Sequence, residues 1–84
     1  MKTASSVLLA LKKAANPADA RGASRYFKTE KGGYAENEKF IGVRMPVLRA
    51  MAKQARQLKL NEVQTVLHND IHEARMLALL ILVE

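Results

Sequence analysis

The chain of 84 residues contains no cysteine and no tryptophan. Without cysteine it cannot form a disulfide framework, a thiolate metal site or a cysteine nucleophile. Its longest apolar stretch, Met76 to Val83, is far shorter than the roughly 20 residues that a helix needs to cross a bilayer. The apolar run before Lys12 and Lys13 is also too short for a signal peptide. We therefore expect no contact with a membrane, and a cytoplasmic location is the simplest interpretation.

The alternation of apolar and polar residues that marks a strand is absent beyond a few positions. On either side of the middle of the chain, Ala, Leu, Met, Lys, Arg and Gln dominate, and these residues favour helices. The sequence therefore predicts an all-α fold. Short connectors between the expected helices predict that neighbouring helices are antiparallel.

Helix start signals predict five helices. Thr3 or Ser5 caps a first helix that runs to about residue 15. Asn16 caps a second, which has Pro17 at its first position and runs to about residue 27. Pro46 opens a third, after a basic and aromatic loop over residues 28–45. Two capping-box patterns predict further helix starts. Asn61 with Gln64 marks the start of a fourth helix, and Asp70 with Glu73 marks the start of a fifth.

The third helix has two contrasting faces. Its apolar residues recur at helical spacing, and Arg49, Lys53 and Arg56 form a cationic stripe on the other side. We expect the apolar face to pack and the cationic face to meet solvent or phosphate. The apolar residues expected to pack in the first, third and fourth helices are Val7, Leu8, Leu11, Ala15, Val47, Leu48, Met51, Ala52, Ala55, Leu58, Val63, Val66 and Leu67.

The fifth helix, expected over residues 71–84, is apolar on nearly all sides, so it needs cover from several neighbours. Four other helices are too few to supply this cover. We therefore expect residues 1–84 to be the N-terminal part of a longer protein of stacked helix pairs. On its own, the chain is expected to self-associate through this helix, because Leu79, Leu80, Leu82 and Val83 cannot all turn inward.

No self-contained catalytic set is visible. Ser5, Ser6 and Ser24 have no nearby histidine to serve as a base. His68 and His72 straddle the predicted break between two helices, so ordinary surface or cap roles are favoured over a zinc pair. Asp19 and Asp70, the only aspartates, occupy expected helix starts, which strongly favours structural roles for both. We expect neither a metal nor another cofactor.

Positive charge is in excess, with 14 Lys and Arg against eight Asp and Glu. This excess favours anionic partners such as nucleic acid, although many small basic proteins bind none. All four aromatic residues lie in the middle segment, where basic residues interleave with Tyr26, Tyr34 and Phe40, and such a mixture suits phosphates and stacked bases. Phe27 and Phe40 are more simply explained as side chains that pin the loop to the helices.

The strings NPADARGASRYFKT, GGYAENEKFIGVRMPVLRAMAK and HNDIHEARMLALLILVE follow one another in the chain. Their order and spacing resemble the N-terminal part of the AlkD-like DNA alkylation repair family, from about residue 16 to the end. The most telling segments are residues 25–28 and residues 40–44, the latter followed by Pro46 and Arg49.

The resemblance implies a solenoid of HEAT-like helix pairs that acts as a DNA glycosylase on N3- or N7-alkylated purines. Such a base already carries positive charge, so it leaves without a general acid, while an aspartate stabilises the sugar cation. In this family that aspartate lies in a Trp-Asp segment of a later repeat, so no catalytic residue is assigned here and the 84-residue chain alone is expected to be inactive. The DNA-facing residues implied are Tyr26, Lys28, Arg44 and Arg49.

The implied partner is double-stranded DNA that carries alkylated bases, and the implied location is the bacterial cytoplasm, at the nucleoid. Two alternatives stay open on the sequence. The chief one is a non-catalytic HEAT-repeat scaffold that binds protein or nucleic acid. The other is a free-standing basic helical module, against which the apolar fifth helix argues.

Overall fold

The computed structural model describes the backbone of residues 2–26 and 39–83, and the side chains of these residues except at 23–26. Five helices occupy this part of the chain: α1 (Ala4–Lys13), α2 (Pro17–Tyr26), α3 (Met45–Gln54), α4 (Leu60–Leu67) and α5 (His72–Val83). Beyond helices, the described residues form one isolated parallel bridge, between Lys39 and Ile71. The all-α prediction is confirmed.

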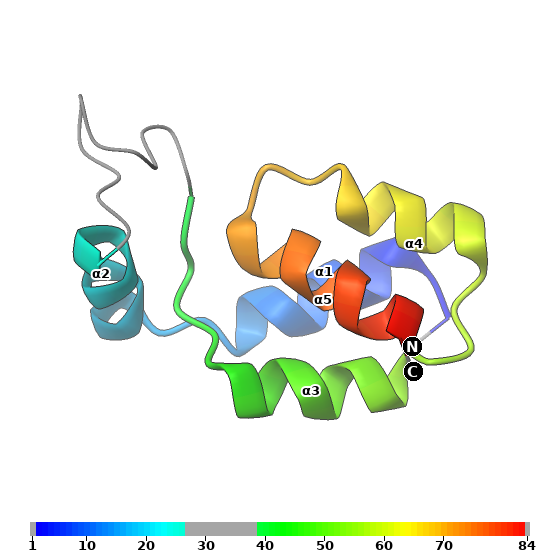
Figure 1. The fold of residues 1–84 in the computed structure, drawn as a ribbon, viewed down its shortest axis with the longest axis horizontal. Helices are drawn as coiled ribbons and strands as arrows, with labels where there is room; N and C mark the ends of the chain where they lie inside the picture. Colours follow the sequence, from blue (N-terminus) through cyan, green and yellow to red (C-terminus); the bar gives the residue numbers. More distant parts are fainter. Residues whose placement is uncertain (1, 27–38, 84) are drawn as a thin grey trace.

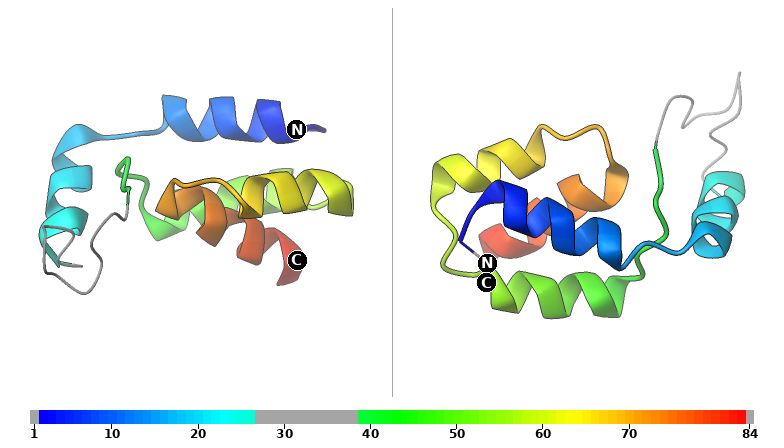
Figure 2. Two further views of the ribbon diagram at one scale, coloured as in Figure 1. Left: turned by 90° about the horizontal axis from the view of Figure 1, so that it is seen from above. Right: turned by 180° about the vertical axis from the view of Figure 1, so that it is seen from behind.

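Helix α5 lies at the centre of the bundle, because it contacts α1, α3 and α4. In Figure 1, α3 and α5 run from left to right whereas α1 and α4 run in the opposite direction. Figure 2 shows, from above and from behind, that α1 and α4 run opposite to α3 and α5. Helices α3 and α4, and helices α4 and α5, are therefore antiparallel, as the short connectors predict. The prediction is wrong for α1 and α2, because α2 lies across α1 despite the short connector between them, held at its start by the bonds of the Asn16 N–H to the carbonyls of Ile41 and Gly42.

The core consists of the apolar faces of these four helices. Val7, Leu11, Val66 and Leu77 are the largest fully buried side chains. The prediction for α3 and the turn after it holds at five of its six apolar positions, and Val47 is the exception, since 43% of it is exposed. The prediction is wrong at Val47 because this residue lies at the edge of the helical stripe, where the bundle no longer covers the side chain.

The first two helix starts agree with the sequence. Thr3 Oγ1 accepts a hydrogen bond from the Ser6 backbone N–H at 3.1 Å, and the Ser6 side chain completes a capping box. The Asn16 side chain accepts hydrogen bonds from the backbone N–H groups of Ala18 and Asp19, at 2.9 and 3.1 Å. Both caps are made by residues that are neighbours in sequence, which is why the sequence predicts them.

The two capping boxes predicted for the later helices are wrong. Helix α4 begins earlier than expected, because Lys59 and not Asn61 is its N-cap, and no side chain caps it. Asn61 lies inside this helix, where its side chain accepts a hydrogen bond from the Glu62 N–H. At α5, Glu73 turns into the protein and Asp70 pairs with Lys39, so neither caps the helix.

Helix α2 stands apart from the other four helices, at the left of Figure 1. An extended segment, residues 39–44, runs between α2 and the bundle and leads into α3. The loop predicted over residues 28–45 lies for the most part outside the described residues. No helix in the described ranges is long and apolar enough to cross a membrane.

Candidate functional site

The extended segment 39–44 is fixed to the start of α5 by a buried carboxylate. Glu73 is only 4% exposed, and its carboxylate accepts hydrogen bonds from the backbone N–H groups of Ile41, Gly42 and Val43 at 2.8–3.2 Å. Glu73 also lies in the first turn of α5, where the helix dipole favours negative charge. The buried charge is thus compensated by backbone groups of two elements.

The same segment is tied to α5 at its beginning. The His72 N–H donates to the Lys39 carbonyl at 2.8 Å, and Lys39 Nζ lies 2.7 Å from an Asp70 carboxylate oxygen. The rings of Phe40 and His72 are 4.6 Å apart. Phe40 is half-buried, so its predicted role in pinning this part of the chain is in keeping with the structure. Phe27 lies outside the described residues.

On its other side, the segment holds the start of α2. The Asn16 N–H donates to the carbonyls of Ile41 and Gly42, both at 3.0 Å. Gly42 has a φ of +83°, and a Cβ atom built there would lie 1.9 Å from the Asn16 carbonyl oxygen and 2.7 Å from the Ala20 nitrogen. Only glycine permits both this backbone conformation and this close approach.

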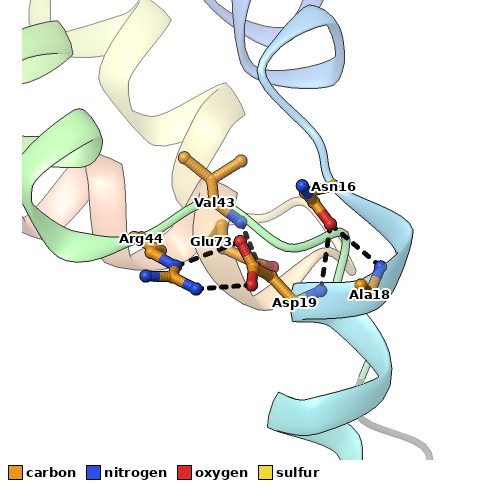
Figure 3. A network of polar contacts seen from close by, with 6 residues as sticks. All are labelled: Asn16, Ala18, Asp19, Val43, Arg44 and Glu73. Atoms are coloured by element: carbon orange, nitrogen blue, oxygen red, sulfur yellow. Dashed lines mark hydrogen bonds and ion pairs between the residues drawn. The ribbon is translucent and has the colours of Figure 1, made fainter.

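Arg44 completes the connection through its side chain, as Figure 3 shows. Its Nε and Nη2 donate to the two carboxylate oxygens of Asp19, at 3.1 and 2.8 Å. These hydrogen bonds lower the pKa of Asp19 below its ordinary value, with the positive charge of Arg44 adding to the effect. The ion pair therefore persists above the ordinary carboxyl pKa and is lost only as pH falls through the lowered value.

Arg44 stays accessible despite this pair, since 75% of its side chain is exposed. It is the N-cap of α3, and Arg49 lies further along the same helix with an exposed side chain. The structure therefore leaves two of the four predicted DNA-facing residues accessible, one at the N-cap of α3 and one within this helix. Tyr26 is the last residue of α2, but its side chain lies outside the description, as does the whole of Lys28.

A pocket of about 540 Å³ lies where α2, the extended segment, α3 and α5 meet. Apolar side chains make up much of its lining, together with Asp19, Arg44, His72 and Glu73. Two of these groups pair with each other, and Glu73 is held by backbone amides, so the described lining of the pocket contains no evident nucleophile with its base. Among the described residues, no cluster of three or more His, Asp or Glu could hold a metal ion.

Comparison with protein families adds the decisive observation. The family model described as DNA alkylation repair enzyme matches residues 7–84. The chain belongs to this DNA alkylation repair family. Comparison with curated proteins and with solved structures gave no match. The resemblance seen in the sequence is confirmed, and the extended segment 39–44, with α2 and α3 on either side, is part of the matched region.

In this member of the DNA alkylation repair family, sequence reasoning missed the role of Glu73. The sequence does indicate that Glu73 is buried, because its position falls on the same helical face as the apolar residues that form the buried side of α5, which are Ala74, Leu77, Ala78 and Ile81. A carboxylate on an apolar face requires donors inside the fold. Asp19 was likewise expected to serve the helix start alone, whereas Asn16 makes that cap and the Asp19 carboxylate pairs with Arg44.

Replacing Gly42 with alanine should destabilise the chain and loosen α2 from the segment. The added Cβ meets backbone atoms, which cannot rotate away, and the positive φ alone costs about 1–3 kcal/mol for a non-glycine residue. The measurement is the free energy of unfolding in urea, followed by circular dichroism. The matched control is Gly22→Ala in α2, where nothing lies within 4 Å of the new Cβ. Because alanine favours helix, this control should be neutral or stabilising, by about 0.5–1 kcal/mol. Equal stability of both variants would contradict the tight contact at Gly42.

Proposed function

We propose that this chain grips DNA in a repair glycosylase that excises N3- or N7-alkylated purines. The observation that carries the proposal is the family match over residues 7–84. The accessible arginines of α3 support it, since guanidinium groups suit backbone phosphates. In this proposal Tyr26, Lys28, Arg44 and Arg49 face the DNA, and HEAT-like pairing of helices provides the frame.

In this proposal the chain binds DNA, and the residues that catalyse base release lie outside it. A purine alkylated at N3 or N7 carries positive charge, so it departs without protonation, and catalysis needs a carboxylate beside the sugar. Each described carboxylate already has a partner: Asp19 pairs with Arg44, Glu62 accepts from the Ala4 N–H, Asp70 pairs with Lys39, and Glu73 binds the amides of the extended segment. These four groups serve the fold.

The isolated chain should therefore release no base from DNA containing 7-methylguanine beyond the spontaneous rate. The assay measures free 7-methylguanine over time, with and without the protein, at a protein concentration that saturates the DNA. Release above the spontaneous rate would place a catalytic group within residues 1–84 and would contradict this proposal. Binding without release fits the proposed grip, and equally a non-catalytic DNA-binding scaffold.

Replacing Arg44 or Arg49 with alanine should weaken binding to duplex DNA of any sequence. Each phosphate that the protein no longer neutralises should flatten the slope of log affinity against log salt concentration by roughly 0.9. Fluorescence anisotropy at several salt concentrations measures both effects. Asp19→Asn provides a test in the opposite direction, because it removes the carboxylate that holds Arg44 and should tighten binding. Unchanged slopes for both arginine variants would mean that these residues serve the fold alone.

We also propose that the isolated chain associates with a second copy through α5. Leu79, Leu82 and Val83 are 50–80% exposed, and each forgoes a corresponding part of the roughly 1.5–3 kcal/mol that full burial of such a side chain provides. Sedimentation over a concentration series should show dimers or larger species, which Leu79→Gln with Leu82→Gln should abolish. Leu60→Gln is the control, since Leu60 is 65% exposed on a different helix. A monomer at every concentration would contradict this proposal.

A further inference from the structure

A second pocket, of about 450 Å³, lies at the end of α3 that is remote from Arg44. Its lining comes from three parts of the chain: the segment before α1, the end of α3 with the turn that follows, and the N-cap of α4. Figures 1 and 2 show the beginning of α1 beside the C-terminal end of α3. The lining residues are Lys2, Lys53, Gln54, Arg56, Gln57 and Lys59, and we call this the cationic pocket.

The cationic pocket contains four positive side chains and no carboxylate among its described lining residues. The nearest described acid in sequence, Glu62, accepts a hydrogen bond from the Ala4 N–H at 3.0 Å, and its negative charge offsets part of the positive charge of the pocket. The two described ion pairs, Asp19 with Arg44 and Lys39 with Asp70, involve none of the lining residues. Four like charges around one pocket repel one another, and a bound anion relieves that repulsion.

The four side-chain charges carry the attraction for an anion, because the start of α4 at the same place adds little to it. Helix α4 begins at the pocket with Lys59 as its N-cap, and a lysine side chain cannot accept a hydrogen bond from the first N–H groups of the helix. The dipole at this end is already met within the helix, because Glu62 lies in its first turn and the Asn61 side chain accepts a hydrogen bond from the Glu62 N–H.

The side chains select the kind of anion. Lysine ammonium and arginine guanidinium groups bind phosphate oxygens, and glutamine amides donate to the same oxygens. A volume of about 450 Å³ lies in the range of small-molecule pockets, roughly 300–1,000 Å³, so the space admits a phosphate together with its attached sugar. Lys53 follows Arg49 by one helical turn, which places both on the same face of α3.

We propose that the cationic pocket binds backbone phosphates of the DNA that Arg49 contacts, so that the duplex follows α3 along its whole length. This inference rests on the proposed DNA grip and extends it to residues at the other end of the helix. The pocket is assembled only by the fold, because Lys2 is distant in sequence from Lys59 and from Arg49.

The test is the double variant Lys53→Gln with Arg56→Gln, in the full 84-residue chain. Both side chains are exposed, so the variant should keep the wild-type unfolding transition. Its affinity for an undamaged duplex should fall, and the slope of log affinity against log salt should flatten by roughly 0.9 for each phosphate that is no longer neutralised. Lys12→Gln with Lys13→Gln is the matched control: it removes the same net charge from exposed sites in the last turn of α1, and its slope should stay unchanged.

The outcomes separate this inference from the proposed function. An unchanged slope for the double variant, combined with a flattened slope for Arg49→Ala, would overturn the cationic pocket and leave the DNA grip intact. Unchanged slopes for the double variant and for both Arg44→Ala and Arg49→Ala would overturn the grip as well, and the pocket's role in it.

A second measurement separates DNA phosphate from free phosphate. The backbone amide signals of Gln57 and Lys59 are followed by NMR while the duplex, or inorganic phosphate alone, is added. Shifts with the duplex that disappear in the double variant are expected. Shifts with inorganic phosphate and none with the duplex would show a site for free phosphate, and would overturn the assignment to DNA.

Discussion

The buried carboxylate of Glu73 is the interaction on which the arrangement around α2 and α3 depends. An ionised carboxylate in a protein interior costs several kcal/mol unless hydrogen-bond donors surround it. Here three consecutive backbone N–H groups of the extended segment supply that compensation. Because the buried carboxylate requires donors and the segment's amides require an acceptor, their hydrogen bonds hold the segment against α5. Its other edge then positions Asn16, and with it the first turn of α2.

The same dependence explains why glycine is required at position 42. The segment must bring its amides to Glu73 on one side and its carbonyls to Asn16 on the other, and the chain turns through a positive φ to do both. A side chain at this point would occupy the space of the Asn16 carbonyl. Arg44 follows two residues later, so its guanidinium meets Asp19 only because the preceding residues have set its position. The ion pair is therefore a consequence of the buried contact.

Local signals in the sequence predicted most of the fold. Apolar spacing located the helices and most of the buried residues of α1, α3 and α4, and the caps at Thr3 and Asn16 involve atoms two or three residues apart. The capping box predicted for α5 is wrong because residues distant in sequence bind the side chains that would form it. Asp70 and Glu73 have the spacing of a capping box, yet Lys39 and the amides of residues 41–43, about 30 positions upstream, take their carboxylates. Spacing alone cannot distinguish a cap from a pair of tertiary contacts, because the sequence pattern is the same for both.

The candidate site likewise has a part that local sequence signals predict and a part that depends on contacts between distant segments. Arg49 could be proposed from helical spacing and family resemblance, whereas the cationic pocket needs the fold to bring Lys2 and Lys59 to the end of α3. The two ends of α3 also differ in electrostatic terms. At the N-terminal end, a phosphate must compete with Asp19 for Arg44, so part of the attraction is offset before DNA arrives. At the C-terminal end, no described carboxylate lines the pocket, and Glu62, the nearest described acid in sequence, binds the Ala4 N–H and none of the lining cations in the described ion pairs. If DNA follows the helix, the pocket should therefore contribute the larger share of salt-dependent affinity, while the N-terminal end, fixed through Glu73, sets the position of α2 relative to the duplex.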